Sequence, residues 1–124
     1  MDRHTEISKE VLKRVRKELE VFSNYPRPEI SLKEIENKIL FQLGCRKEKS
    51  RRGTAVKYSH TILHSDPRYT AGIFSIHRKG GSKDKPMIGR NDFKAYLLPH
   101  IKRILEALEG GQDEQKNAER LYEA

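Results

Sequence analysis

Paired cysteines, tryptophan and long apolar runs are all missing from this sequence of 124 residues. With a single cysteine, Cys45, the chain has no internal disulfide framework and no Cys-rich zinc site, and a lone thiol fits a reducing cytoplasm. No stretch approaches the roughly 20 apolar residues that a membrane helix needs, and the first residues do not resemble a signal peptide. We therefore expect a cytoplasmic protein that makes no contact with a membrane.

Apolar and aromatic residues are also scarce, at 35% and 7% of the chain, so the hydrophobic core must be small. A chain of this length buries roughly two-thirds of the surface that it exposes when unfolded, which suffices for one core. We expect a single α+β domain over residues 1–111, with an N-terminal helix at 5–22 and a core at 30–110. Residues 112–124 are acidic and polar, and we expect a poorly ordered tail there.

Positive charge, by contrast, is abundant: 26 Lys and Arg against 18 Asp and Glu give a net charge of +8. The excess is concentrated in the middle of the chain. Residues 45–90 carry twelve Lys and Arg and three Asp and Glu (net +9), whereas residues 109–124 carry a net charge of −3. A central basic block of this kind favours a polyanionic partner, most often nucleic acid, over a small metabolite.

Helical periodicity marks two segments before the basic block. In residues 5–22 the apolar side chains recur at spacings of three and four, which is typical of an amphipathic helix. The next helix opens with Ser31 and Glu34, which form a capping box. It ends at Gly44, which stands where a left-handed C-cap residue belongs.

A third helix follows the basic block and opens at Asn91, a good N-cap residue. Pro99 lies inside its apolar pattern, so we expect a kink or a fresh start near Leu98. Gly110-Gly111 is expected to end this helix.

Strand patterns lie between the helices. Residues 54–63 and 69–77 are rich in β-branched and aromatic side chains that alternate, and residues 86–88 form a short candidate edge strand. Residues 45–53 are too polar to bury and are expected to be a connection. The predicted fold is therefore α+β, with the order α-α-β-β-(β)-α: a small antiparallel sheet of two to three strands with the helices packed on one face.

No nucleotide-binding or serine-nucleophile motif is present. A metal site would have to use His60, His64 and His77, but His60 and His64 on one strand lie roughly 13 Å apart, too far to share an ion without a bend. We expect no metal and no other cofactor. Histidines at these positions can act as general acids or bases in RNA cleavage, or can contact phosphate without chemistry.

Residues 32–105 also carry a pattern of short motifs around the strands. The pattern consists of a helix ending in glycine, a basic stretch, Ser59-His60, His64-Ser65-Asp66, a strand ending in His77, a Gly-rich turn and a closing helix. It resembles the HicA/YcfA-like mRNA interferases, whose small domain has the α-β-β-β-α layout of double-stranded-RNA-binding domains. In that family a Gly-Ser-His on the first strand supplies the catalytic histidine, so the resemblance implies His60 as the catalytic residue.

The sequence departs from the family pattern at two places. Tyr58 stands where the family has glycine, and the spacing between His60 and His64 is one residue shorter than the family's. The helix at 5–22 is an addition to the minimal family domain.

Three functions are therefore open. The working hypothesis is a module that binds nucleic acid, RNA rather than DNA, without catalysis. The second is a metal-independent ribonuclease of the interferase type, with His60 as its catalytic residue. The third is a small assembly protein whose stripe at residues 7–22 pairs with a partner protein or with a second copy in a homodimer.

The candidate nucleic-acid-binding residues share a positive charge and a place in the central block. They are Arg46, Lys47, Lys49, Arg51, Arg52, Lys57, Arg78, Lys79, Lys83 and Lys85. Tyr58 and Tyr69 are aromatic and could stack on bases, although half-buried packing is the commoner role of such strand residues.

Overall fold

A computed structural model describes residues 7–49, 55–78 and 85–123 of the chain. In chain order its elements are α1 (Lys9–Ser23), β1 (Glu29–Ser31), α2 (Leu32–Ile35), η2 (Glu36–Leu40), β2 (Arg46–Glu48), β3 (Ala55–Ser59), η3 (Thr61–Leu63), β4 (Ile73–His77), β5 (Met87–Gly89), α3 (Arg90–Asp92), η4 (Phe93–Leu97) and α4 (Leu98–Glu123). The segments η2 and η4 are π-helical, and η3 is a 3-10 helix.

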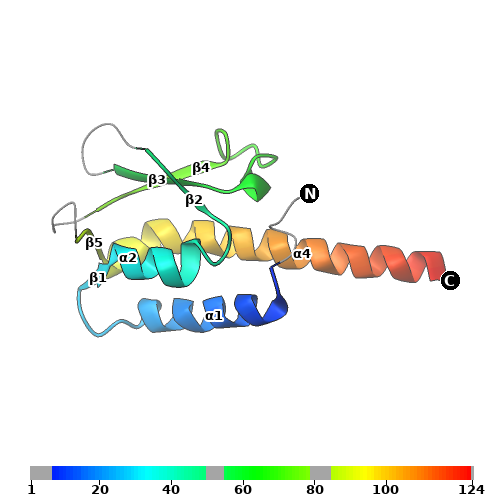
Figure 1. Ribbon diagram of the computed structural model, residues 1–124, viewed down its shortest axis with the longest axis horizontal. Helices are drawn as coiled ribbons and strands as arrows, with labels where there is room; N and C mark the ends of the chain where they lie inside the picture. The colour runs from blue at the N-terminus through cyan, green and yellow to red at the C-terminus, as the bar shows by residue number, and fades with distance from the viewer. Residues whose placement is uncertain (1–6, 50–54, 79–84, 124) are drawn as a thin grey trace.

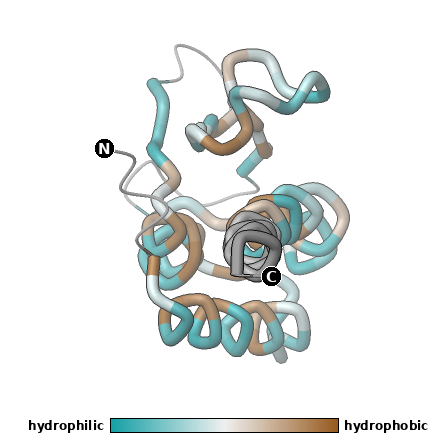
Figure 2. The backbone as a smooth tube through the Cα atoms, turned by 90° about the vertical axis from the view of Figure 1, so that its right-hand side faces the viewer, coloured by the Kyte–Doolittle hydropathy of each residue, from teal (hydrophilic) through white to brown (hydrophobic). Residues whose placement is uncertain are grey.

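The architecture is α+β, as the sequence predicts, with α1, α2 and α4 on one side of the main sheet and the short 3-10 helix η3 at the end of it (Figure 1). The strand order of this antiparallel sheet is β2-β3-β4. The helices α2 and α4 form the layer next to the sheet, and α1 lies beyond them. Figure 2, a view along α4, shows the same layers. The apolar segments of the helices face one another between the layers. No helix in the described ranges is both long and apolar enough to cross a membrane.

The first helix begins at Lys9 rather than at residue 5, because Ser8 caps it: the Ser8 hydroxyl accepts a hydrogen bond from the Val11 N–H at 3.2 Å. An Arg16–Glu109 ion pair of 2.6 Å joins this helix to α4. The apolar stripe is buried in the protein's own core, through Leu12, Val15, Leu19 and Phe22. The assembly hypothesis depended on this stripe being available to a partner. The stripe is already covered within one chain, so that support is gone.

The second helix has the predicted cap residues at both ends, although the Glu34 carboxylate makes no hydrogen bond back to Ser31 among the described residues, so the capping box is half formed. The Ser31 hydroxyl accepts a hydrogen bond from the Glu34 N–H, and Gly44 has φ +90. The Cys45 N–H donates to the Leu40 carbonyl at 2.9 Å, which completes the expected C-cap motif and turns the chain toward the sheet.

Two of the predicted strands are present but shorter than expected. β3 ends at Ser59, where the chain enters η3, and β4 begins only at Ile73. Phe74 and Ile76 of β4 are buried, whereas Ile73 is on the opposite face, as the alternation predicts.

The prediction of a connection at residues 45–53 was wrong for Arg46–Glu48, which form the edge strand β2. Polar residues suffice there because only one edge of β2 pairs and its outer face is open to solvent. The predicted third strand, β5, pairs with the unpredicted β1 in a separate two-stranded ladder instead of joining the main sheet.

The last helix begins at Arg90, with Gly89 and not the predicted Asn91 at its N-cap. It does not start afresh near Pro99: the π-helical turn η4 runs into α4 at Leu98 in helical conformation, and the helix does not end at Gly110-Gly111. α4 continues to Glu123. A Cβ at Gly110 would meet no atom within 4 Å, so nothing packs there to turn the chain. The residues that follow are mostly good helix formers such as Gln, Glu, Lys and Ala, and they offset the cost of roughly 1 kcal/mol for each glycine.

Candidate nucleic-acid interface

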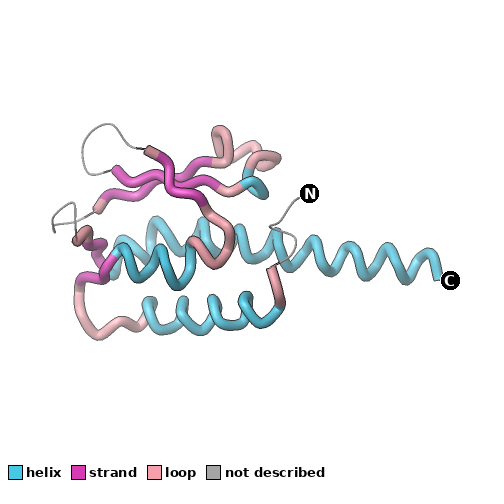
Figure 3. The backbone as a smooth tube through the Cα atoms, in the orientation of Figure 1, coloured by secondary structure: helices cyan, strands magenta, loops and turns pink. Residues whose placement is uncertain are grey.

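The main sheet has one face against the helices and one face turned away from them (Figure 3). Tyr58, Phe74 and Ile76 are buried on the helix side. Side chains alternate along a strand, so the neighbours of these residues belong to the other face, hereafter the outer face. From the strand register, the outer face carries Arg46, Glu48, Ala55, Lys57, Ser59, Ile73, Ser75 and His77.

Two cations of the outer face are exposed and have no ionic partner. Arg46 and Lys57 belong to none of the salt bridges among the described residues. Glu48 is the one carboxylate on the described part of this face, and it accepts a hydrogen bond from Ser59 Oγ at 2.6 Å. Positive side chains therefore outnumber negative ones where the sheet meets solvent.

Further positive charge lies at one end of the sheet. Ala55 is paired with His77, which puts the start of β3 beside the end of β4, and β2 ends at the same place because it is antiparallel to β3. Lys49 follows β2, Arg78 follows β4, and Lys85 comes shortly before β5, which starts on this side of the molecule. We call Lys49, Arg78 and Lys85 the basic end. The other predicted contacts, Arg51, Arg52, Lys79 and Lys83, lie outside the described residues.

Lys47 is placed differently from the other predicted cations. Its Nζ lies 3.0 Å from Oε2 of Glu36, a carboxylate that is only 4% exposed, and the Tyr58 hydroxyl donates to the same oxygen at 2.7 Å. Burial, the hydrogen bond to Glu36 and the charge of Glu36 raise the pKa of Tyr58 above its usual range. Burial also raises the pKa of the Cys45 thiol to about 12, so this thiol stays protonated. Lys47 thus neutralises a buried charge within the fold.

His60, predicted as the catalytic residue, is buried and only 1% exposed. Its Nε2 lies 2.6 Å from the carbonyl oxygen of Leu43, and its Nδ1 accepts a hydrogen bond from the Ile62 N–H at 3.0 Å. These two partners require a neutral ring with the proton on Nε2. A ring held in this way caps η3 and fixes the turn after Leu43. The expectation of an accessible histidine on a strand was wrong, because the chain leaves the strand at Ser59.

The other two histidines of the sequence motif do not join His60 in one site. His64 is exposed and ends η3, with Gly72 packed so closely that a Cβ there would lie 2.5 Å from His64 Cδ2. His77 lies at the far end of β4 on the outer face. Within the described ranges, no group of three or more His, Cys, Asp or Glu side chains is arranged to hold a metal ion.

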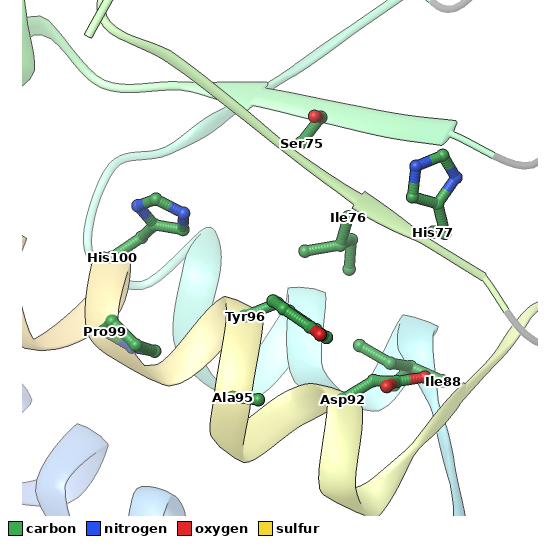
Figure 4. A pocket seen from close by; sticks show the side chains of 9 residues that line it. All are labelled: Ser75, Ile76, His77, Ile88, Asp92, Ala95, Tyr96, Pro99 and His100. Atoms are coloured by element: carbon green, nitrogen blue, oxygen red, sulfur yellow. The ribbon is translucent and has the colours of Figure 1, made fainter. Parts of the chain in front are cut away.

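A pocket of about 480 Å³ lies between β4 and the helical segment that runs from α3 into α4 (Figure 4). The strand contributes Ser75, Ile76 and His77, and the helices contribute mainly Asp92, Tyr96 and His100. Figure 4 shows the Tyr96 ring lying across the pocket, with His100 on one side of it and Asp92 on the other.

The histidine of this pocket is held by aromatic neighbours. The His100 ring stacks on Phe74 at a centroid distance of 4.9 Å, and its Nδ1 is hydrogen-bonded to the Tyr69 hydroxyl at 2.7 Å. Burial lowers the pKa of His100 below its usual value, so the ring is neutral at pH 7. Tyr69, considered above for base stacking, is therefore a support for His100. Tyr96, by contrast, is 63% exposed.

Sequence reasoning missed this pocket, although a signal was present. Asp92, Tyr96 and Pro99 recur at helical spacing on the face beside the buried stripe of Phe93 and Leu97. A second face of this kind, with an exposed aromatic between polar residues, indicates a contact surface in addition to a core surface.

Comparison of the chain with protein-family models, with curated proteins and with solved structures finds no match. Function is therefore inferred from the charges, the exposure and the contacts of the described residues.

Proposed function

We propose that this chain is a cytoplasmic protein that binds nucleic acid, RNA in preference to DNA, through the outer face of its sheet and the basic end. The observation that carries the proposal is which cations of the main sheet have a carboxylate partner and which do not. On the helix side of the sheet, the cation Lys47 is paired with a carboxylate. On the outer face and at the basic end, Arg46, Lys49, Lys57 and Arg78 take part in no salt bridge between described residues.

Unpaired surface cations are what a phosphate backbone requires. Each phosphate that a Lys or Arg neutralises releases condensed counterions, and this release provides most of the sequence-independent affinity. Four described cations are available for such contacts: Arg46, Lys49, Lys57 and Arg78. If each contacts one phosphate, the log–log slope of affinity against salt is about −2.8 for a single strand and about −3.6 for a duplex.

The preference for RNA is supported by polar groups that lie between these cations and can form hydrogen bonds. Ser75 and His77 lie on the outer face beside Lys57. A hydroxyl or an imidazole can hydrogen-bond to a 2′-hydroxyl, the group by which a protein distinguishes RNA from DNA. The proposal is for binding without cleavage, because the ring nitrogens of His60, the one catalytic candidate, are bonded to the main chain.

The test is a comparison of two charge-reversal variants with equal net charge. One carries Arg46→Glu with Lys57→Glu on the outer face, and its control carries Lys13→Glu with Arg14→Glu on the exposed side of α1. With labelled single-stranded RNA, we expect the first variant to lose at least roughly tenfold in affinity and its salt slope to become shallower by about 1.4, since two phosphate contacts are lost. The control should bind like the wild type.

Two results would contradict the proposal. If the wild type does not bind RNA or DNA at low salt, the protein has no nucleic-acid function. If the two variants lose affinity equally, the attraction depends on total charge and no particular face is involved. A competition between RNA and DNA of the same sequence tests the preference for RNA separately.

A further inference from the structure

The outer face provides charge for phosphates but no surface on which bases can stack. The described residues on it are short, charged or aliphatic, apart from the imidazole of His77. Single-stranded nucleic acid gains about 1–3 kcal/mol for each base stacked on an aromatic ring. An aromatic group for this purpose must lie beside the face, and the exposed Tyr96 is in the pocket beyond β4.

The wall of this pocket on the strand side is the open edge of the sheet. β4 is the last strand of the sheet within the described residues. In an antiparallel ladder, hydrogen-bonded and non-bonded pairs alternate. The His60 N–H donates to the Gly72 carbonyl at 3.1 Å, so Phe74 and Ile76, two and four residues further along, are the residues of β4 that bond to β3. The N–H and C=O of Ser75 therefore point toward the pocket.

The rest of the pocket combines apolar walls with a few polar groups. Ile76 points from the strand toward the helix, above the Tyr96 ring, and Ala95 lies below (Figure 4). The side chain of Asp92 is half-buried and makes no ion pair or side-chain hydrogen bond with another described residue. A site with apolar walls, one exposed aromatic ring and a small number of polar groups is typical of pockets that receive a flat heterocycle.

We propose that this pocket receives an unpaired base of a bound RNA single strand. The base stacks on Tyr96, its edge hydrogen-bonds to the main chain of Ser75, and the Asp92 carboxylate accepts from the amino or imino groups of the base. The phosphates on either side reach the basic end. The proposal rests on the nucleic-acid function proposed above and identifies the substrate as single-stranded, since the bases of a duplex are paired and cannot enter the pocket.

A peptide strand added to the edge of β4 is the other occupant that such a pocket can take. Arg78, which follows the end of β4 and makes no salt bridge with a described residue, favours the polyanion. Tyr96 favours it too, since it is largely exposed and an aromatic ring can stack on a base.

The experiment compares Tyr96→Ala with Phe41→Ala, which removes another exposed aromatic ring, from the end of η2. The probe is a fluorescein-labelled RNA of about 12 nucleotides in mixed sequence, used as a single strand and as a duplex. We expect Tyr96→Ala to weaken binding of the single strand by roughly 5- to 150-fold, which corresponds to one lost stack. Its affinity for the duplex and its salt slope should not change, because no phosphate contact is lost. Phe41→Ala should bind both probes like the wild type.

A second variant, Ala95→Phe, fills the pocket and should reproduce the loss of Tyr96→Ala. If the wild type shows salt-dependent binding and both pocket variants bind the single strand as the wild type does, the base pocket is overturned. The edge of β4 then remains a candidate site for a peptide strand, and the proposed function stands. Equal losses for Tyr96→Ala and Phe41→Ala, or equal losses for single strand and duplex, would also overturn it. A wild type that binds no nucleic acid would remove both proposals.

Discussion

The two ends of the main sheet hold their polar residues in opposite ways. At the end where β3 runs into η3, which we call the closed end (His60, His64 and Gly72), the His60 ring is bonded to the main chain on both sides. At the basic end, Lys49 and Arg78 make no salt bridge with any described residue. A buried and bonded polar group stabilises the fold, whereas an exposed and unpaired one is available to a partner. The motif histidines lie at the closed end, whereas the cations of the proposed nucleic-acid contact lie at the other end.

The largest expected effect is at the closed end. His60→Ala removes a buried ring and leaves the Leu43 carbonyl and the Ile62 N–H without their partners. We expect the free energy of unfolding to fall by roughly 3–5 kcal/mol, measured by urea denaturation. His64→Ala is the control and should change stability by less than about 0.5 kcal/mol, because His64 is exposed. A His60→Ala protein as stable as the wild type would show that the closed end is not a structural site.

The next effect comes from the main chain at the same end. Gly72 has φ +67, and a Cβ there would lie 2.7 Å from the His60 carbonyl oxygen. Gly72→Ala should therefore cost about 1–3 kcal/mol. Gly110→Ala in α4 makes the matched control, since its Cβ has open space, and it should stabilise the protein by about 0.5–1 kcal/mol. If Gly72→Ala and Gly110→Ala both raise the melting temperature, the backbone at Gly72 accepts a side chain, and the closed end does not require glycine there.

The smallest effect on stability is expected at the basic end. Arg78→Ala should change the free energy of unfolding by less than about 0.5 kcal/mol, as a surface substitution without a described ion pair. Its RNA affinity should nevertheless fall, with a salt slope shallower by about 1, because one phosphate contact is lost. If Arg78→Ala lowered the stability and left the salt slope unchanged, Arg78 would be a structural residue like His60. The contrast between the two ends of the sheet would then be wrong.

The parts of the fold that depend on local contacts were predictable from the sequence. Ser31 and Gly44 form their hydrogen bonds with residues close to them in the sequence, so the N-cap and the end of the second helix could be identified. Phe74 and Ile76 could be assigned to the core from alternation alone. An irregularity near Pro99 could also be predicted from the ring of that residue, and it takes the form of the π-helical turn η4.

Distant contacts determine what could not be predicted. β2 contains no apolar residue, so no pattern distinguishes it from a loop, and β5 pairs with β1 almost sixty residues earlier in the chain. The burial of His60 depends on the Leu43 carbonyl, seventeen residues away. Lys47 and Arg46 were both predicted to bind nucleic acid, and the contact of Lys47 with Glu36 is what distinguishes the two in the structure. The position of Tyr96 beside the edge of β4 likewise requires the packed structure.

The contact of Lys47 and Tyr58 with the same Glu36 oxygen has a consequence for how the sheet aligns. In most sheets the hydrophobic pattern selects the register, because a slip by one residue exchanges the two faces. β2 is wholly charged and offers no such pattern. A slip of one residue would present Glu48 or Arg46 in place of Lys47, and Glu48 would put two carboxylates against each other in a buried site. A slip that presents Arg46 would keep a cation against Glu36. The Glu36 side chain, which belongs to the helical segment η2, therefore opposes a slip of β2 in one direction only.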